Sequence, residues 1–401
     1  MVLRHSLALD SKPSRLVPEW ILTILFSNSH IPFGLPQHKS PYLIKYGALS
    51  RILVMKLMGN QPLIEAKILK DQALRIIMRL ATPFVPKPIC VTTLQEHRSV
   101  ISVAFHPSAP ILATGSDDGT AKLWRLTADG SVAECVATLE GHSGSISSVA
   151  FHASLPVLAT GSYDNTAKLW RLNSDSSAAS CVATLQGYRW GVTSVTFHAS
   201  LPILATGSAG NTTKLWRMNY DGSAASCVAT LEGHRFGVNC VVFHDSLPIL
   251  ATGSSDRTAK LWRLNSDCSA ASCVATLEGH SGSVRSVAFH TTLPFLATGS
   301  YDQTAKLWRL NSDGSAASCV ATLHVHRGGV NSVALHASLP ILATGSWDKT
   351  AKLWRLNSDG SAASCVATLQ GHSNGVRSVA FHASLPILAT GSDDKTAKLW
   401  R

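Results

Sequence analysis

One phrase of 13 residues recurs along the chain and decides how it folds. It first reads Ala-Thr-Gly-Ser-Asp-Asp-Gly-Thr-Ala-Lys-Leu-Trp-Arg, from Ala113 to Arg125. Six variants of it follow, each ending in Lys-Leu-Trp-Arg, with the tryptophans at Trp170, Trp216, Trp262, Trp308, Trp354 and Trp400. Successive tryptophans are 46 residues apart. A fixed period of this length is typical of a repeat architecture.

Each repeat unit contains four short segments of strand-forming residues. In the second unit these are residues 146–151, 157–161, 166–172 and 181–185, which are rich in β-branched and apolar side chains. Polar stretches with Pro, Gly, Asn or Ser separate the segments, as turns do. Short strands of even spacing, repeated along a chain, are typical of the blades of a β-propeller.

Counting the strands predicts a closed ring. Sets of three strands begin near Val100, Ile146, Val192, Val238, Val284, Val330 and Val376. The last set ends at Arg401 without an outer strand, whereas residues 89–94 form an outer strand with no set of their own. Pairing the two hides a sheet edge. The predicted fold over residues 89–401 is all-β, a seven-bladed propeller of four-stranded antiparallel blades that its N-terminal outer strand closes.

The repeat resembles the WD-repeat (Trp-Asp repeat) family. The matching motifs are Leu-Glu-Gly-His142, Leu-Ala-Thr-Gly-Ser162-x-Asp164 and Lys-Leu-Trp170, and they recur over residues 89–401. The chain departs from the family pattern at one position, because an Arg follows the Trp in every unit where the family has Asp. The resemblance implies a propeller that binds its partners through the loops of one face.

The resemblance also implies that a His, a Ser, an Asp and a Trp form one buried hydrogen-bonded chain in each blade. Trp only donates, Asp only accepts, and Ser and His do both. The six sets are His97, Ser116, Asp118, Trp124; His142, Ser162, Asp164, Trp170; His234, Ser254, Asp256, Trp262; His280, Ser300, Asp302, Trp308; His326, Ser346, Asp348, Trp354; and His372, Ser392, Asp394, Trp400. The third unit has Tyr188 and Gly210 in place of His and Asp, so we expect blade 3 to be the loosest.

These residue types also occur in hydrolase active sites, but their repetition argues against catalysis. A Ser/His/Asp set that recurs in six units indicates a structural network. The sequence contains no nucleotide-binding loop, metal-ligand spacing or lone nucleophile, so we expect neither an enzyme nor a cofactor or metal. We interpret seven further histidines as turn residues copied with the repeat, rather than as a metal or anion site: His106, His152, His198, His244, His290, His336 and His382.

Positions at which the near-identical units differ are the candidates for specific binding. The residue before the structural Asp, or before Gly210 in unit 3, reads Asp117, Tyr163, Ala209, Ser255, Tyr301, Trp347 and Asp393. The second residue of the first strand reads Ile101, Ser147, Thr193, Asn239, Arg285, Asn331 and Arg377. The loop after the His position carries Trp190 in unit 3 and Phe236 in unit 4.

The resemblance implies that all three series lie on the loop face. We expect an arc of five aromatic side chains over units 2 to 6, facing an acidic seam of Asp117 and Asp393 across the closure. The arc is Tyr163, Trp190, Phe236, Tyr301 and Trp347. Exposed Trp, Tyr and Arg are typical of binding hot spots. The predicted function is a non-enzymatic scaffold that binds a protein or peptide partner, as a monomer or as part of a larger complex.

The first 88 residues are strongly basic, with 12 Lys and Arg against 4 Asp and Glu. Residues 89–401 hold 23 against 20, so we expect no nucleic-acid partner for the propeller, because nucleic-acid binding requires a concentrated basic face. We predict a helix over residues 62–80, a weaker one over 43–58 and a proline-rich linker over 82–88.

Two alternative functions rest on this basic segment. Residues 16–26 loosely resemble the start of an F-box, and a substrate receptor of a ubiquitin ligase is one alternative. The basic helix at 62–80 could instead lie on a membrane surface, although docking on its own chain is the preferred interpretation. The Arg-rich, acid-poor start also allows a mitochondrial or plastid transit peptide.

Nine cysteines complete the pattern, and seven of them recur at one repeat position. The seven are Cys90, Cys135, Cys181, Cys227, Cys273, Cys319 and Cys365. The sequence has no Cys-x-x-Cys pair and no secretory signal. We interpret these residues as small buried hydrophobes in a reducing compartment, and expect an intracellular protein of the cytoplasm or nucleus.

Overall fold

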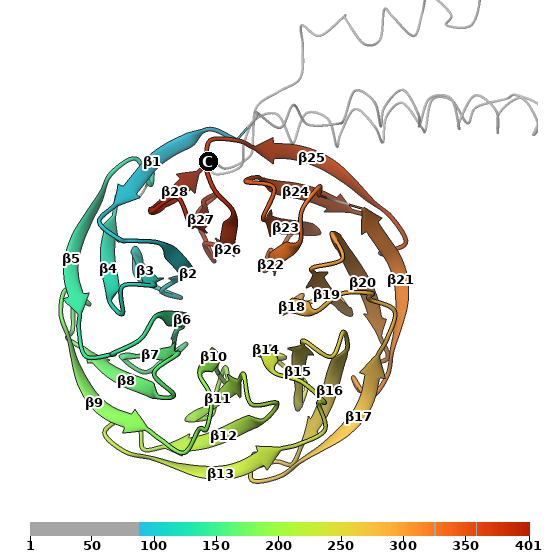
Figure 1. The fold of residues 1–401 in the computed structure, drawn as a ribbon, viewed down its shortest axis with the longest axis horizontal. Coiled ribbons are helices and arrows are strands. Elements are labelled where there is room, and N and C mark those ends of the chain that lie inside the picture. Colours follow the sequence, from blue (N-terminus) through green and yellow to red (C-terminus); the bar gives the residue numbers. More distant parts are fainter. Residues whose placement is uncertain (1–87, 128, 325, 358) are drawn as a thin grey trace, which may run out of the picture. The chain divides into compact units, whose positions relative to one another are not determined.

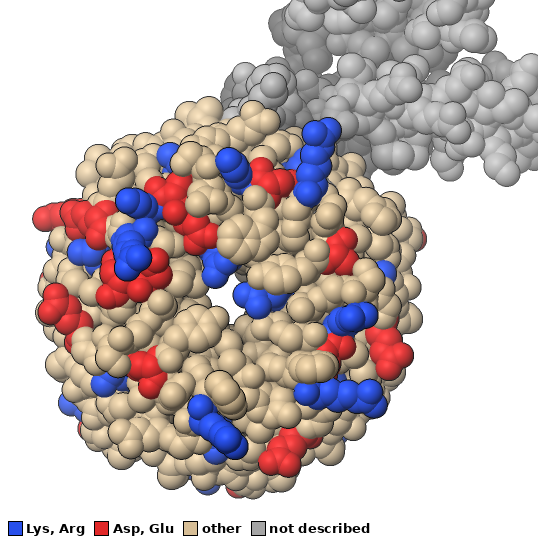
Figure 2. Space-filling view, in the orientation of Figure 1, with Lys and Arg blue, Asp and Glu red and all other residues tan. Residues whose placement is uncertain are grey.

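Seven four-stranded antiparallel sheets follow one another in a closed ring (Figure 1), and the space-filling view shows an opening at its centre (Figure 2). The structure is a computed structural model that describes residues 88–127, 129–324, 326–357 and 359–401. Every element in these ranges is a strand. The predicted seven-bladed propeller is therefore confirmed, and each predicted set of three strands begins at the expected residue.

The four strands of a blade are arranged side by side, in order from the channel to the rim. The innermost strands are β2 (Val100–Phe105), β6 (Ile146–Phe151), β10 (Val192–Phe197), β14 (Val238–Phe243), β18 (Val284–Phe289), β22 (Val330–Leu335) and β26 (Val376–Phe381). The second strands are β3 (Ile111–Ser116), β7 (Val157–Ser162), β11 (Ile203–Ser208), β15 (Ile249–Ser254), β19 (Phe295–Ser300), β23 (Ile341–Ser346) and β27 (Leu388–Ser392). The third strands are β4 (Ala121–Leu126), β8 (Ala167–Leu172), β12 (Thr213–Met218), β16 (Ala259–Leu264), β20 (Thr304–Leu310), β24 (Ala351–Leu356) and β28 (Thr396–Trp400). The outer strands are β5 (Ala133–Leu139), β9 (Ala179–Leu185), β13 (Ala225–Leu231), β17 (Ala271–Leu277), β21 (Ala317–His324), β25 (Ala363–Leu369) and β1 (Cys90–Gln95).

The two ends of the propeller sequence complete one blade. Its sheet has the order β1-β28-β27-β26, with β1 antiparallel to β28. The Ile89 amide donates to the Arg401 carbonyl at 2.9 Å, and the Arg401 amide donates to Ile89 at 3.0 Å. This confirms the predicted closure, which pairs the outer edge of the last blade.

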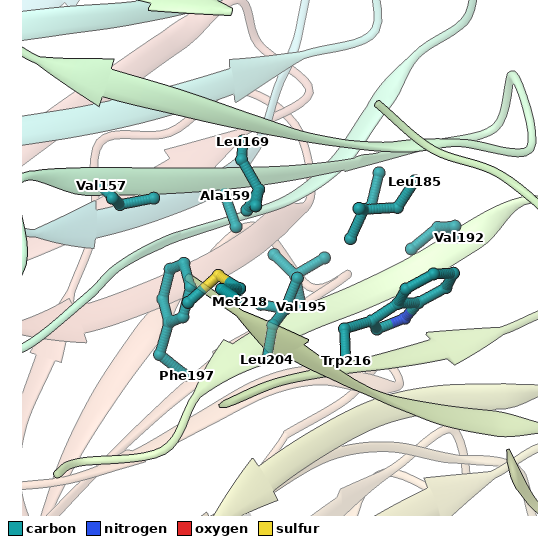
Figure 3. Packing of buried hydrophobic residues seen from close by; sticks show 11 residues of the cluster. Val157, Ala159, Leu169, Leu185, Val192, Val195, Phe197, Leu204, Trp216 and Met218 are labelled. Carbon is teal, nitrogen blue, oxygen red and sulfur yellow. The ribbon is translucent and has the colours of Figure 1, made fainter. Parts of the chain in front are cut away.

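The hydrophobic core lies between neighbouring blades (Figure 3). In the cluster between blades 2 and 3, Val157 and Leu169 of one blade pack with Val192 and Trp216 of the next, all buried. The glycine of the repeated Ala-Thr-Gly-Ser lets the blades approach this closely. A Cβ atom at Gly161 would lie 2.8 Å from Val192 Cγ1, so a larger residue would push the blades apart.

The repeated cysteines do not lie where the sequence analysis expected them. Six of the seven are exposed, Cys135 is half-buried, and all nine cysteines are free. The expectation that they are buried was wrong because they lie on the outermost strand of each blade. In blade 2, a β-bulge between Leu169 and Trp170 sets the register of β8 against the outer strand β9. Trp170 therefore pairs with Cys181, whose side chain faces solvent.

Several predictions concern residues outside the described ranges. These are the helices at 43–58 and 62–80, the F-box-like residues 16–26, and all but the last residue of the linker at 82–88. Among the described residues, no helix has the length and apolar character needed to cross a bilayer.

Candidate functional site: the loop face and the mouth of the central channel

A buried hydrogen-bonded chain supports the loop face in six of the seven blades. In blade 2 the Trp170 indole N–H donates to Thr160 Oγ1 at 2.9 Å, and this hydroxyl lies 2.7 Å from His142 Nε2. His142 Nδ1 lies 2.7 Å from Asp164 Oδ2. A carboxylate only accepts, so Nδ1 carries the imidazole proton, Nε2 accepts from Thr160, and the chain runs in one direction from Trp to Asp.

The chain contains Thr where the sequence analysis placed Ser. Ser162 instead donates to the Gly144 carbonyl at 2.9 Å and accepts from the Asp164 amide at 3.1 Å, which ties two loops together. The reason is register: Trp170 lies opposite Leu158, so its indole reaches Thr160 and not the more distant Ser162. The linking threonines are Thr114, Thr160, Thr252, Thr298, Thr344 and Thr390.

Burial and hydrogen bonding hold this chain in one charge state. Burial lowers the pKa of His142, although its contact with Asp164 opposes the shift. Burial raises the pKa of Asp164, but hydrogen bonds from Thr166 and His142 outweigh it and lower the pKa overall. The imidazole is therefore neutral and the carboxylate ionised near neutral pH. The serine hydroxyls are buried and bonded to the backbone, which suits a structural role.

Blade 3 closes its chain differently. The Trp216 indole donates to the Tyr188 hydroxyl at 2.8 Å, and this hydroxyl also bonds with Thr206 Oγ1. The Trp190 indole occupies the space of the missing Asp, since a Cβ atom at Gly210 would lie 2.7 Å from Trp190 Cδ1. The Asp-to-Gly departure of unit 3 is thus linked to the presence of Trp190.

We predict that blade 3 opens more readily than blade 2. The hydrogen-bonded chain of blade 3 ends without a charged acceptor. A hydrogen bond to a charged group contributes roughly 1 kcal/mol more to stability than one between neutral groups. Amide hydrogen exchange should therefore be about fivefold faster in β11 and β12 than at the equivalent amides of β7 and β8. Equal or slower exchange in β11 and β12 would contradict the prediction.

The five predicted arc residues are all exposed at the loop face, with exposed fractions from 38% for Trp347 to 63% for Phe236. Antiparallel strands alternate in direction, so the loop before each first strand and the turn after each second strand meet at one end of the propeller. The contacts agree with this, because the Tyr163 amide in the turn after β7 donates at 3.0 Å to the carbonyl of Ser145, which lies in the loop before β6 of the same blade.

Three of the aromatic rings pack against a glycine in the next blade. A Cβ atom would lie less than 3.0 Å from the ring in the pairs Gly191/Tyr163, Gly329/Tyr301 and Gly375/Trp347. In three other blades the turn after the second strand carries Asp117, Ser255 or Asp393. The residue that corresponds to the glycine, in the loop before the first strand of the next blade, is then a serine: Ser145, Ser283 or Ser99. Each of these three rings is therefore paired with a glycine in the neighbouring blade. Comparing the turn residue of one unit with the loop residue of the next could have found this pairing in the sequence. Gly237 faces only Ala209, so a glycine does not by itself require a ring.

The acidic seam is present but partly neutralised. Ser99 joins its two members, since the Asp117 amide donates to the Ser99 carbonyl at 3.3 Å and Ser99 Oγ donates to Asp393 Oδ1 at 2.8 Å. Arg98 Nε lies 3.8 Å from Asp117, and Arg377 Nε lies 3.8 Å from Asp393.

The second residues of all seven first strands meet in one pocket at the mouth of the channel. The pocket is lined by Ile101, Ser147, Thr193, Asn239, Arg285, Asn331 and Arg377, together with Tyr163 of the arc. Asn239 and Asn331 each donate a side-chain N–H to the first strand of the next blade, at 2.9 Å from the Val284 and Val376 carbonyls. The guanidinium groups of Arg285 and Arg377 stack on Tyr301 and Trp347, both at 4.8 Å.

The second histidine series joins blades at the opposite face. His152 Nδ1 accepts from the Ser154 and Leu155 amides of its turn, and its ring lies 5.1 Å from the Phe197 ring of the next blade. Among the residues that the structure describes, no three His, Cys, Asp or Glu side chains come together as metal ligands would. The hydrogen bonds to the turn and the packing against the next blade give these histidines a structural role in the turn.

The Arg that follows the Trp contacts the next blade at five of its seven positions, which are Arg125, Arg171, Arg217, Arg263 and Arg309. Arg125 Nη2 lies 3.1 Å from Asp175 Oδ2, and Arg171, Arg217 and Arg263 form equivalent pairs at 2.8, 3.1 and 2.7 Å. These exposed pairs contribute little individually, about 0–1 kcal/mol each.

Comparison with known proteins agrees with this geometry. The family profile "WD domain, G-beta repeat" matches residues 88–125, 133–171, 179–217, 225–263, 271–309, 317–355 and 363–401. The chain belongs to the WD-repeat family. The WD-repeat propeller supports a role as a protein-interaction scaffold, and this fold is typically non-enzymatic.

Individual WD-repeat relatives match over short stretches. Nuclear distribution protein nudF of Emericella nidulans is 44% identical over 62 residues, which is 15% of this chain and 13% of that protein. Nuclear distribution protein PAC1 of Tuber melanosporum is 39% identical over 64 residues, 16% of this chain and 13% of that protein. Protein CIA1 of Arabidopsis thaliana is 48% identical over 54 residues, 13% of this chain and 15% of that protein. The matches thus span less than a sixth of each relative.

Proposed function

We propose that this protein is a non-enzymatic interaction scaffold whose loop face binds a protein or peptide partner. The observation that carries the proposal is the aromatic arc: five large aromatic side chains are exposed at one face of a rigid ring. The other copies of the turn position carry Ala, Ser or Asp, so the repeat fold itself does not require a ring there.

Physical chemistry favours a partner at this face. An exposed indole or phenol ring leaves apolar area in water, and covering it with a partner is favourable. The glycine contacts and the stacked guanidinium groups restrain three of the rings, so little conformational freedom is lost on binding. Rigid Trp and Tyr side chains with Arg beside them are the residues that dominate measured binding energies.

The cellular setting is proposed on other grounds. Free, exposed cysteines recur around the rim of the propeller, and such thiols persist in a reducing compartment. We therefore place the protein inside the cell, in the cytoplasm or nucleus. The ubiquitin-ligase and membrane alternatives rest on residues outside the described ranges, and no observation favours them.

Replacing two arc residues tests the proposal. The variant Trp190→Ala/Trp347→Ala is expected to lose at least tenfold in partner capture from cell extract, because a single hot-spot aromatic contributes about 2 kcal/mol or more. Quantitative mass spectrometry of captured proteins is the measurement. Tyr220→Ala is the matched control, since Tyr220 is an exposed aromatic in a turn at the opposite end of the blade.

Unchanged capture by the double variant, with the thermal midpoint of the parent protein, would show that the arc is not the binding site. Equal losses for Tyr220→Ala would show that the effect is not specific to the loop face.

A further inference from the structure

The mouth of the central channel carries positive charge without matching negative charge in its lining. Two of the eight lining residues are arginines, Arg285 and Arg377, and none is acidic. In the space-filling view, basic side chains lie beside the central opening (Figure 2). A recess with low-dielectric walls and one sign of charge concentrates ions of the opposite sign.

Arg285 is held in place by neutral groups. Its Nη1 donates to Asn239 Oδ1 at 3.0 Å, and its guanidinium stacks on the Tyr301 ring. Its Nε is buried and has no hydrogen-bond partner among the described residues. No carboxylate of the described chain lies within ion-pair distance of this side chain.

Arg377 has one acid at ion-pair distance but no hydrogen bond to it. Its Nε lies 3.8 Å from Asp393 Oδ1, beyond hydrogen-bonding distance, and the same oxygen already accepts from Ser99. The Arg377 guanidinium stacks on Trp347, which fixes its plane at the pocket. Both arginines are thus oriented by aromatic rings and keep donors available.

Asn331 lines the same pocket and holds a buried acceptor. Its side chain is buried, with 9% exposed, and its Nδ2 donates to the Val376 carbonyl, which fixes the amide orientation. Its Oδ1 is buried without a partner in the part of the chain that the structure describes. A buried polar atom of this kind costs about 1–3 kcal/mol when left unpaired. Because this oxygen is closed to solvent, the groups that the pocket offers to a ligand are the donors of the two arginines.

We infer that the channel mouth is a subsite for an acidic side chain of a bound peptide segment. The carboxylate lies between the guanidinium groups of Arg285 and Arg377, whose planes the Tyr301 and Trp347 rings fix at the pocket. Arginine recognises carboxylate and phosphate oxygens by the same paired hydrogen bonds, so a phosphorylated side chain is a second source of this chemistry. Tyr163 lines the pocket and belongs to the arc, so the subsite deepens the proposed function and rests on it.

Selection from a random peptide display library with the full-length protein tests the inference. Selected peptides are expected to be enriched in Asp and Glu at one position. Synthetic peptides with Glu, Gln or phosphoserine at that position then separate carboxylate from phosphate recognition, by fluorescence polarisation. Replacing Glu by Gln should weaken binding at least tenfold, as should the variant Arg285→Gln/Arg377→Gln.

Two matched variants keep the result interpretable. Arg98→Gln/Arg235→Gln removes the same charge from exposed loops of the same face and should change affinity less than threefold. Arg285→Lys/Arg377→Lys keeps the charge and should retain more affinity than the Gln pair. Thermal midpoints confirm that each variant is folded.

Selected peptides without an acidic position, or arginine variants that bind as the parent does, would overturn the inference. If those peptides still require Trp190 and Trp347 for binding, the loop face remains the proposed binding site and only the acidic subsite is rejected. Peptides that require neither the arginines nor the arc would remove both. A library that yields no binder would overturn the subsite as well.

Discussion

Substituting Leu94→Asp is expected to open the propeller and to lower its unfolding free energy by at least about 3 kcal/mol. Leu94 lies in β1, has only 4% of its surface exposed, and packs in the core with Ala397 and Leu399 of β28. Burying an unpaired carboxylate there costs more than the lost apolar contacts alone. Release of β1 also exposes the β28 edge, so the variant should self-associate. Urea unfolding and light scattering measure the two effects.

Thr93→Asp is the matched control for this prediction. Thr93 is the neighbouring residue of the same strand, but its side chain is exposed and points away from the core. A carboxylate there lies beside Lys398, whose Nζ already contacts the Thr93 hydroxyl at 3.1 Å. The urea midpoint of the Thr93→Asp variant should match that of the parent protein. Equal midpoints for Leu94→Asp and the parent would show that β1 does not hold the ring closed.

Acidification from pH 7 to pH 5 is expected to destabilise the propeller by several kcal/mol. Six histidines of the Trp–Thr–His–Asp chains have pKa values lowered by burial, so the unfolded chain takes up protons before the folded one does. Stability is therefore full above the ordinary histidine pKa of about 6.5 and is lost as the pH falls below it. Each such group contributes at most about 1.4 kcal/mol per pH unit in this window.

The geometry supplies the reason for this proton sensitivity. His142 Nε2 accepts from Thr160, and a proton on Nε2 would place two donors against each other. Protonation thus costs the hydrogen bond that Thr160 donates to the imidazole and buries a positive charge, although Thr160 can still accept from the Trp170 indole. The carboxylates add to the loss only at lower pH, because the pKa of Asp256 is lowered to about 2 by hydrogen bonds that outweigh the effect of burial.

Blade 3 provides the control for the acid prediction. The variant His142→Tyr/Asp164→Gly gives blade 2 the Tyr and Gly that blade 3 has naturally, and so removes one titrating chain. The slope of unfolding free energy against pH, measured by urea unfolding between pH 6.5 and 5, should become smaller by up to about 1.4 kcal/mol per pH unit. An unfolding free energy that stays constant over this range would contradict the assignment of neutral, buried histidines.

The 46-residue period was enough to predict the number of blades, the strand order and the closure by residues 89–94. These follow from local properties, because strand segments, turns and repeat copies can each be recognised within one unit. The exposure of Trp190 and Trp347 was predictable for a similar reason, since both occupy loop positions where other units carry unrelated residues.

Side-chain relations between neighbouring strands of one blade were not predictable from the repeat alone. The sequence analysis placed Ser162 in the polar chain and expected Cys181 to be buried, whereas strand register selects Thr160 and turns Cys181 outward. Thr160 and Ser162 lie on the same face of one strand, so their spacing could not separate them. Only the position of the neighbouring strand does.

The channel mouth depends most strongly on the closed ring. Arg285, Asn331 and Arg377 are 46 residues apart along the chain, and a linear sequence carries no sign that they share one pocket. Curvature of the stacked blades brings the second residue of every first strand to a common axis. The repeat pattern thus specified each blade, whereas packing of seven blades around that axis created the pocket, because only there do side chains from different units meet.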